Sequence, residues 1–190
     1  MDGEEIVKKL KFCGKNVKIW DLAKIVFPEN ISMGDETMID DFTYLYGQSE
    51  GINIGRFCHI GVGCIIQSYG LITFEDFVGV GANSTIFAGT DDYHGSGFQG
   101  LGVFGDKYRN ITKAPVTLKR HVHVGIGSII LPGVTIGEGC SVGAGSIVTR
   151  DLPEWTICIG SPCKPVKEKT REKQLAMEKE FLKEYYGQLG

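Results

Sequence analysis

An aliphatic residue recurs at every sixth position near the C-terminal end of the chain, and this period constrains the fold more than any other feature. The positions are Leu118, Val124, Ile130, Ile136, Val142 and Val148. A six-residue period fits neither an α-helix nor an alternating hairpin sheet. It is typical of a stacked β-solenoid, in which short strands end in tight corners and each side of the coil contributes one inward aliphatic side chain.

The same period is present upstream, at Ile54, Ile60, Ile66, Ile72 and Val78. The spacing from Gly79 to Gly125 is not a multiple of six, so a non-repetitive segment interrupts the solenoid, and we place this inserted loop at residues 90–114. A weaker run between Met33 and Thr43 joins the next run out of phase, which predicts a small bulge near residues 47–51.

Small residues usually stand four positions after the aliphatic ones. They are Cys58, Cys64, Ser68, Ala82, Val122, Ser128, Val134, Cys140 and Ser146. Small side chains there allow the chain to turn close to the axis without overfilling it. Asp76 falls in the same slot. Because a lone buried carboxylate costs several kcal/mol, we expect Asp76 to find a backbone partner or to lie where the coil is distorted.

Three phrases carry a resemblance to a known family: residues 130–137 (ILPGVTIG), 142–148 (VGAGSIV) and 159–164 (IGSPCK). They resemble the signature of the hexapeptide-repeat acyltransferases. The resemblance implies an all-β fold, a left-handed parallel β-helix of triangular cross-section, assembled as a homotrimer with acyl-CoA in the grooves between subunits. The chain is most similar to the sugar acetyltransferases of capsule, lipopolysaccharide and nucleotide-sugar pathways.

The chain is long enough for one domain with appendages. We expect a capping helix at residues 1–13, the β-helix at 14–164 and a C-terminal helix within 165–190, because apolar residues recur at helical spacing near both ends. A net charge of −3 gives no general attraction for nucleic acid. No apolar run is long enough to span a bilayer, and the first residues lack the features of a signal peptide, so we expect a cytoplasmic protein.

The six cysteines predict free structural thiols. Cys58, Cys64 and Cys140 occupy the small-residue slot, where a thiol behaves as a small hydrophobe. No serine or cysteine is accompanied by the base that a nucleophile needs, so we expect no covalent acyl-enzyme.

The inserted loop is the expected catalytic region, since loops on rigid scaffolds commonly carry sites. The resemblance implies a loop histidine that removes the proton of the acceptor hydroxyl, which assigns His94 as general base, with Asp91 or Asp92 fixing its tautomer. The alternative is a solvated histidine beside aspartates that cap the loop through Asx-turns. His59, at an outer corner, is a second candidate base.

His121 and His123 invite a zinc interpretation, because alternate residues on a strand share a face. The γ-class carbonic anhydrases, which share this β-helix, use three histidines; here His59 or His94 would have to be the third. The spacing of the pair does not match that family, so we favour exposed corner side chains and expect no metal.

The acyl donor implied by the resemblance is acetyl-CoA. Backbone N–H groups at Gly125, Ser128, Gly143 and Ala144 match the glycine-rich corners that line the pantetheine arm and stabilise the oxyanion. Lys164 and Lys167 match the positions that contact the CoA phosphates, and Ser161, in the turn before them, is a further expected cofactor-binding residue. Ordinary repeat corners and a charged linker explain the same residues equally well.

Together these features predict an acetyl-CoA-dependent O-acetyltransferase acting on a sugar or nucleotide-sugar by direct attack in a ternary complex. The close alternative is an N-acetyltransferase acting on a nucleotide-linked amino sugar, because an amine attacks without prior removal of a proton. A zinc enzyme of the carbonic anhydrase type and a catalytically silent scaffold are the more distant alternatives.

Overall fold

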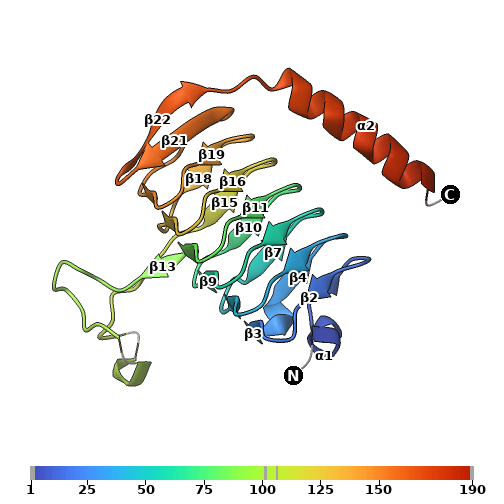
Figure 1. Ribbon diagram of the computed structural model, residues 1–190. Helices are drawn as coiled ribbons and strands as arrows, with labels where there is room; N and C mark the ends of the chain where they lie inside the picture. Colours follow the sequence, from blue (N-terminus) through green and yellow to red (C-terminus); the bar gives the residue numbers. More distant parts are fainter. Residues whose placement is uncertain (1–2, 101, 106, 189–190) are drawn as a thin grey trace.

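The computed structural model describes residues 3–100, 102–105 and 107–188, and these form a parallel β-helix whose stacked coils have three sides (Figure 1). The first side contains β1 (Phe12–Cys13), β4 (Ile31–Met33), β7 (Ile52–Ile54), β10 (Ile72–Phe74), β15 (Val116–Leu118) and β18 (Thr135–Ile136). The second contains β2 (Lys18–Ile19), β5 (Met38–Ile39), β8 (His59–Ile60), β11 (Gly79–Val80), β16 (His123–Val124), β19 (Ser141–Val142), β21 (Thr156–Gly160) and β22 (Cys163–Glu168). The third contains β3 (Lys24–Val26), β6 (Tyr44–Gly47), β9 (Ile65–Ser68), β12 (Thr85–Phe87), β17 (Ile129–Ile130) and β20 (Ile147–Val148).

The predicted aliphatic positions form the core. All six from Leu118 to Val148 are buried, and so are the small residues between them, such as Ser128 and Cys140. The fold is a left-handed β-helix: the six-residue repeat predicted the solenoid, and the resemblance implied its left-handed winding. All six cysteines are free.

In the upstream coils, the inward aliphatic positions after Ile66 lie two residues later than predicted. Phe74, not Ile72, pairs with Ile54, and Val80 pairs with Ile60, because extra residues are accommodated at the corner after β9. The small slots are therefore Val78 and Ser84, both buried, and the assignment of Asp76 and Ala82 to these slots is wrong. Asp76 lies at an outer corner, where its Oδ1 accepts a hydrogen bond of 2.7 Å from the Arg56 N–H.

The bulge predicted near residues 47–51 is present. The Gly51 N–H donates to the Gln48 carbonyl at 3.1 Å, and Ser49 and Gly51 have positive φ angles of 55° and 82°. This turn absorbs the extra residues between β4 and β7, so Met33 and Ile54 still pair.

Both terminal helices are present but shorter than expected. Helix α1 (Gly3–Val7) ends well before Phe12, which already belongs to β1. At the other end, β22 folds back antiparallel on β21, and α2 (Glu172–Gln188) begins only after it. The hairpin covers an edge of the last coil that would otherwise have unpaired backbone groups. Residues 1, 2, 189 and 190 of the expected terminal segments lie outside the described residues.

One corner of the coil carries a column of aromatic rings in the left-handed conformation. Phe57, Phe77, His121 and Trp155 have φ angles between 48° and 62°. The Phe57 and Phe77 rings stack at 4.9 Å, and those of Phe77 and His121 stack at 5.0 Å. Helix α2 packs over the column, with Phe181 edge-on to Phe57. These contacts hold a conformation that is unfavourable for bulky residues.

The inserted loop leaves the coil as a two-stranded ribbon of β13 (Gly89–Thr90) and β14 (Thr112–Lys113). Beyond the ribbon, the loop contains a short 3₁₀ helix, Gly102–Phe104, and another 3₁₀ helix, Pro28–Asn30, precedes β4. Figure 1 shows the loop extending away from the coil, with α2 on the opposite side. In the described part of the chain, no helix is long and apolar enough to cross a membrane.

Candidate active site

A cavity of about 250 Å³ lies where the inserted loop leaves the coil. Its wall combines apolar groups with a few polar ones: Gln67, Tyr69, Phe87, Gly89, Thr90, Asp91, Tyr93, Arg109 and Ile111. Such a mixture is typical of small-molecule sites. The third side of the coil supplies the floor, and the two ends of the loop supply the charged groups.

Asp91 is the carboxylate that faces this cavity. Its Oδ1 accepts a hydrogen bond of 2.9 Å from Arg109 Nη2, and its Oδ2 accepts one of 3.1 Å from the Gly100 N–H. The hydrogen bond from Arg109 and then that from Gly100 hold the pKa of Asp91 below its ordinary value. Asp91 is therefore a negative charge on the cavity wall at neutral pH.

Asp92 has a different role, because the loop backbone uses both of its oxygens. Its Oδ1 accepts from the His94 N–H at 3.0 Å, and its Oδ2 accepts from the Ser96 N–H at 2.6 Å and the Ser96 hydroxyl at 2.9 Å. The side chain is buried, and these bonds lower its pKa. This is the Asx-turn alternative: Asp92 organises the loop.

The His94 side chain is exposed, and its contact with Asp92 is made by the backbone. Within the ranges that the structure describes, no hydrogen bond joins its imidazole to Asp91 or Asp92. The expected arrangement, in which a carboxylate fixes the His94 tautomer, is therefore not found among the described residues.

His59 does have a carboxylate partner. Its Nε2 lies 2.9 Å from Asp40 Oδ2 on the outer face of the second side, and the imidazole is half-exposed. A carboxylate–imidazole pair of this kind orients a general base. The pair lies on β8 and the corner after β5, away from the residues that line the loop cavity.

His121 and His123 do not share a face, which removes the ligand pair of the zinc interpretation. His121, at the left-handed corner, is buried, and its Nε2 lies 2.7 Å from Glu178 Oε2 of α2. Burial, followed by the charges of Arg120 and Lys169, lowers the pKa of His121. His123 is exposed on β16. Among the described residues, no cluster of three or more His, Cys, Asp or Glu side chains is arranged to hold a metal ion.

Coil stacking already explains the glycines at the expected pantetheine corners. A Cβ on Gly125 would lie 2.5 Å from the Ala144 nitrogen, and one on Gly143 would collide with the Ile159 side chain. The Ser128 hydroxyl is buried and donates to the Gly125 carbonyl at 2.8 Å, and the Ser128 N–H donates to the Ser84 hydroxyl at 3.3 Å. Ala144 is exposed at its corner.

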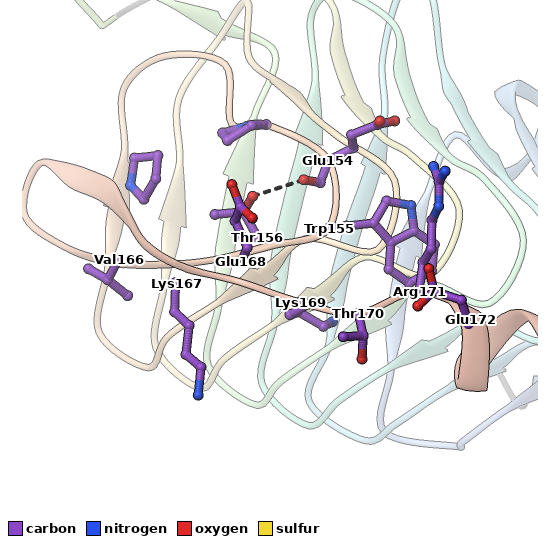
Figure 2. A pocket seen from close by; sticks show the side chains of 12 residues that line it. Glu154, Trp155, Thr156, Val166, Lys167, Glu168, Lys169, Thr170, Arg171 and Glu172 are labelled. Carbon is purple, nitrogen blue, oxygen red and sulfur yellow. Dashed lines mark hydrogen bonds between the residues drawn. The ribbon is translucent and has the colours of Figure 1, made fainter.

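Ser161 and Lys164 are exposed at the turn and start of β22. Lys167, further along the strand, lines a second cavity of about 700 Å³ between the terminal hairpin and the start of α2 (Figure 2). Lys169 and Arg171 also line it. The Lys169 ammonium is already bound, since it donates to the Gly139 carbonyl at 2.7 Å and the Ser141 hydroxyl at 2.9 Å.

Comparisons with known proteins agree with this architecture. The family model "Bacterial transferase hexapeptide (six repeats)" matches residues 115–150. The dTDP-4-amino-4,6-dideoxy-D-glucose acyltransferase of Escherichia coli is 34% identical over 171 residues, which cover 90% of this chain and 88% of that protein. The chain belongs to the hexapeptide-repeat acyltransferases.

Two further members of the family extend the comparison. The N-acyltransferase AntD of Bacillus cereus, solved in complex with dTDP and 3-hydroxybutyryl-CoA, is 35% identical with a TM-score of 0.89, over 98% of this chain and 100% of that one. The galactoside O-acetyltransferase of Escherichia coli (strain K12) is 29% identical over 72% of this chain and 63% of that protein.

In this hexapeptide-repeat acyltransferase, the sequence did not predict three residues of the candidate sites. They are Asp40, beside His59, and Tyr69 and Arg109, which line the loop cavity. Asp40 and Tyr69 stand at ordinary corner positions and give no signal. Arg109 gives one, since it is the only arginine in the inserted loop and therefore the one guanidinium partner that the loop offers to its aspartates.

Proposed function

We propose that the chain transfers an acyl group from a coenzyme A thioester to the amino group of a nucleotide-linked amino sugar. The observation that carries the proposal is the ionised Asp91 on the wall of the loop cavity, without a histidine directed at it. The E. coli relative is named for a dTDP-amino sugar, and AntD is an N-acyltransferase, which supports the amine over the hydroxyl.

The chemistry favours the same acceptor. The amine lone pair attacks the thioester carbonyl, a C–N bond forms, the C–S bond breaks, and coenzyme A leaves as the thiolate. The nitrogen loses its proton only after attack, so a weakly basic carboxylate such as Asp91 suffices to collect it. A hydroxyl has to be deprotonated as it attacks, and this calls for a stronger base than a carboxylate of lowered pKa.

A covalent acyl-cysteine intermediate does not fit the thiols. Burial raises the pKa of the Cys58 thiol to about 12 and also raises that of Cys64. The thiolate is the nucleophilic form, so such thiols are inert. Direct attack in a ternary complex is the consistent route.

The second candidate is acetylation of a sugar hydroxyl, which the sequence alone favoured. The His59–Asp40 pair supports it, since its imidazole is half-exposed, whereas the imidazole of the His121–Glu178 pair is buried. Similarity to a galactoside O-acetyltransferase also supports it.

The assembly that we propose is a homotrimer with the acyl donor between subunits. Its support is an exposed apolar ridge along the corner between the second and third sides, where Phe42 is 66% exposed, Val62 41% and Ile126 60%. Apolar surfaces of this kind mark interfaces. Ala144, one of the residues expected at the pantetheine arm, is exposed where this corner continues, which supports a donor site beside the ridge. Both proposed substrates are charged and water-soluble, which fits a cytoplasmic enzyme.

The product of the reaction tests the acceptor. Purified protein is incubated with acetyl-CoA and, separately, dTDP-4-amino-4,6-dideoxyglucose, dTDP-glucose and a galactoside, and products are treated with hydroxylamine, which cleaves esters but spares amides. We expect a hydroxylamine-resistant product from the amino sugar alone. A cleavable ester from the hydroxyl acceptors, lost in His59→Ala, would establish the second candidate instead.

Lys167→Gln is expected to raise the dissociation constant of coenzyme A about three- to fivefold, the size of one exposed ionic contact. The lysine lines the cavity beside the terminal hairpin, where the resemblance implies the CoA phosphates. Calorimetric titration with coenzyme A and dephospho-CoA measures the change. Lys173→Gln, on exposed α2, is the matched control; equal dissociation constants for the two variants would exclude the assignment.

A further inference from the structure

The neck of the inserted loop brings together two residues from its opposite ends. Asp91 directly follows β13, and Arg109 precedes β14. The antiparallel pairing of Gly89 with Lys113 and of Thr90 with Thr112 sets this approach. Arg109 Nη2 consequently lies 2.9 Å from Asp91 Oδ1.

This ion pair is more shielded than a usual surface pair. The Arg109 side chain is only 12% exposed, and its Nε is buried without a hydrogen-bond partner among the described residues. The bond to Asp91, and more weakly the Tyr69 side chain, stabilises the charged guanidinium and raises the pKa of Arg109. Exposed pairs contribute little because water screens them, and shielding makes this one stronger.

The other groups near Asp91 cannot replace Arg109. The cavity lining contributes two phenols, Tyr69 and Tyr93, and a phenol does not supply a positive charge. Asp92 adds a second negative charge close by, and the exposed His94 interacts with Asp92. On the described cavity wall, Arg109 is the single permanent cation.

We propose that Arg109 is a positioning residue for acyl transfer, which holds the Asp91 carboxylate fixed and ionised at the cavity wall where the acceptor amine binds. The inference rests on the proposed function. Arg109 donates a hydrogen bond to Asp91 Oδ1, and the Gly100 N–H donates one to Asp91 Oδ2. Since a carboxylate oxygen accepts in more than one direction, Asp91 can still receive the proton that the nitrogen releases.

Arg109 also makes that proton easy to release again. A carboxylate beside a guanidinium binds a proton weakly, so Asp91 passes it to water and returns to its ionised form before the next turnover. The buried Nε supplies a second argument, because an unpaired buried donor is costly unless a partner arrives. A ring oxygen or hydroxyl of the sugar is a partner of the right chemistry.

The test compares Arg109→Gln with Arg109→Lys, and Lys107→Gln removes one positive charge from the same loop as the control. Two quantities are measured: kcat/KM for the amino sugar between pH 4 and 8, and the ¹³C NMR titration of the Asp91 carboxyl, assigned with Asp91→Asn. The titration extends down to about pH 2, because the pKa of Asp91 lies below its ordinary value. Thermal melting checks that each variant folds.

We expect Arg109→Gln to lower kcat/KM about 10- to 100-fold at pH 7, the size usual for a displaced reacting group. The deficit grows as the solution becomes more acidic, because Asp91 then gains its proton at a higher pH than in the wild type. Arg109→Lys keeps the pKa of the Asp91 carboxyl below its ordinary value, because the positive charge remains. It restores only part of kcat/KM, since an ammonium group lacks the planar geometry of the guanidinium. Lys107→Gln leaves both quantities unchanged.

If Arg109 only stabilised the fold at the neck of the loop, the two measurements would give a different result. The loss of kcat/KM in Arg109→Gln would be the same factor at every pH, and the Asp91 titration would not move; that result overturns the inference. A failure of the proposed function is distinguishable, because the wild type would then acylate no amino sugar while the NMR titration still shifted in Arg109→Gln.

Discussion

Asp91→Asn is expected to lower kcat/KM for an amino-sugar acceptor by about 100-fold, near the lower end of the effect of losing a general base. The amide has the shape of the carboxylate and still accepts from Arg109, but it can neither take up a proton nor attract an ammonium group. Steady-state kinetics at pH 7.5, following release of the CoA thiol, measures the change. The thermal midpoint is expected to stay within a few degrees, because the side chain lies at the neck of an exposed loop.

His94→Ala is the matched comparison, since His94 lies on the same loop with an exposed side chain. We expect its kcat/KM to stay within about twofold of wild type, against about 100-fold for Asp91→Asn. If His94→Ala is instead the severe variant and Asp91→Asn the mild one, the loop histidine is the base, as the sequence first indicated. AntD variants have been crystallised in which one aspartate is replaced, so such substitutions are compatible with this fold.

Phe74→Ala is expected to destabilise the protein by about 3–5 kcal/mol, the usual cost of truncating a buried phenylalanine. Phe74 is 1% exposed and heads the fully buried side chains by size. It pairs with Ile54 on one side and Leu118 on the other, so the cavity would open across three coils. Urea unfolding at one fixed protein concentration measures the change, because oligomers gain stability with concentration.

Thr73→Ala is the control on the same strand, since Thr73 points outward from the coil and is only partly buried. Its effect is expected to stay within about 0.5 kcal/mol. Equal unfolding midpoints for the two variants would mean that the core between β7, β10 and β15 is not packed as described.

The solenoid could be predicted because its determinants are local. Each inward position, from Leu118 to Val148, is set by a six-residue period that needs no knowledge of distant contacts. The phase error upstream has a physical cause. Ile72 and Val78 are buried two positions before Phe74 and Val80, which pair with the aliphatic residues of the preceding coil, so Ile72 and Val78 imitate the period.

The candidate site was less accessible to sequence reasoning. The Asp91–Arg109 pair depends on the β13–β14 ribbon, whose two-residue strands leave no readable pattern. Gly125 shows a second difficulty. Close coil stacking and close approach of a ligand both require a residue without a side chain, so the letter alone cannot separate the two causes. The predicted start of α2 was too early, because the sequence of β22 has no periodic pattern that would identify it as a strand.

The way the coil closes beneath the inserted loop bears on how this enzyme can be altered. Ile72 pairs directly with Val116, and Phe74 with Leu118, so the wall is continuous whether or not residues 91–111 are present. The inserted loop, on which we propose the acceptor site, is thus not needed for the strand pairing of the coil. Transplanting it between relatives should carry acceptor preference along and leave donor handling to the host, which offers a direct route to engineered sugar acylation.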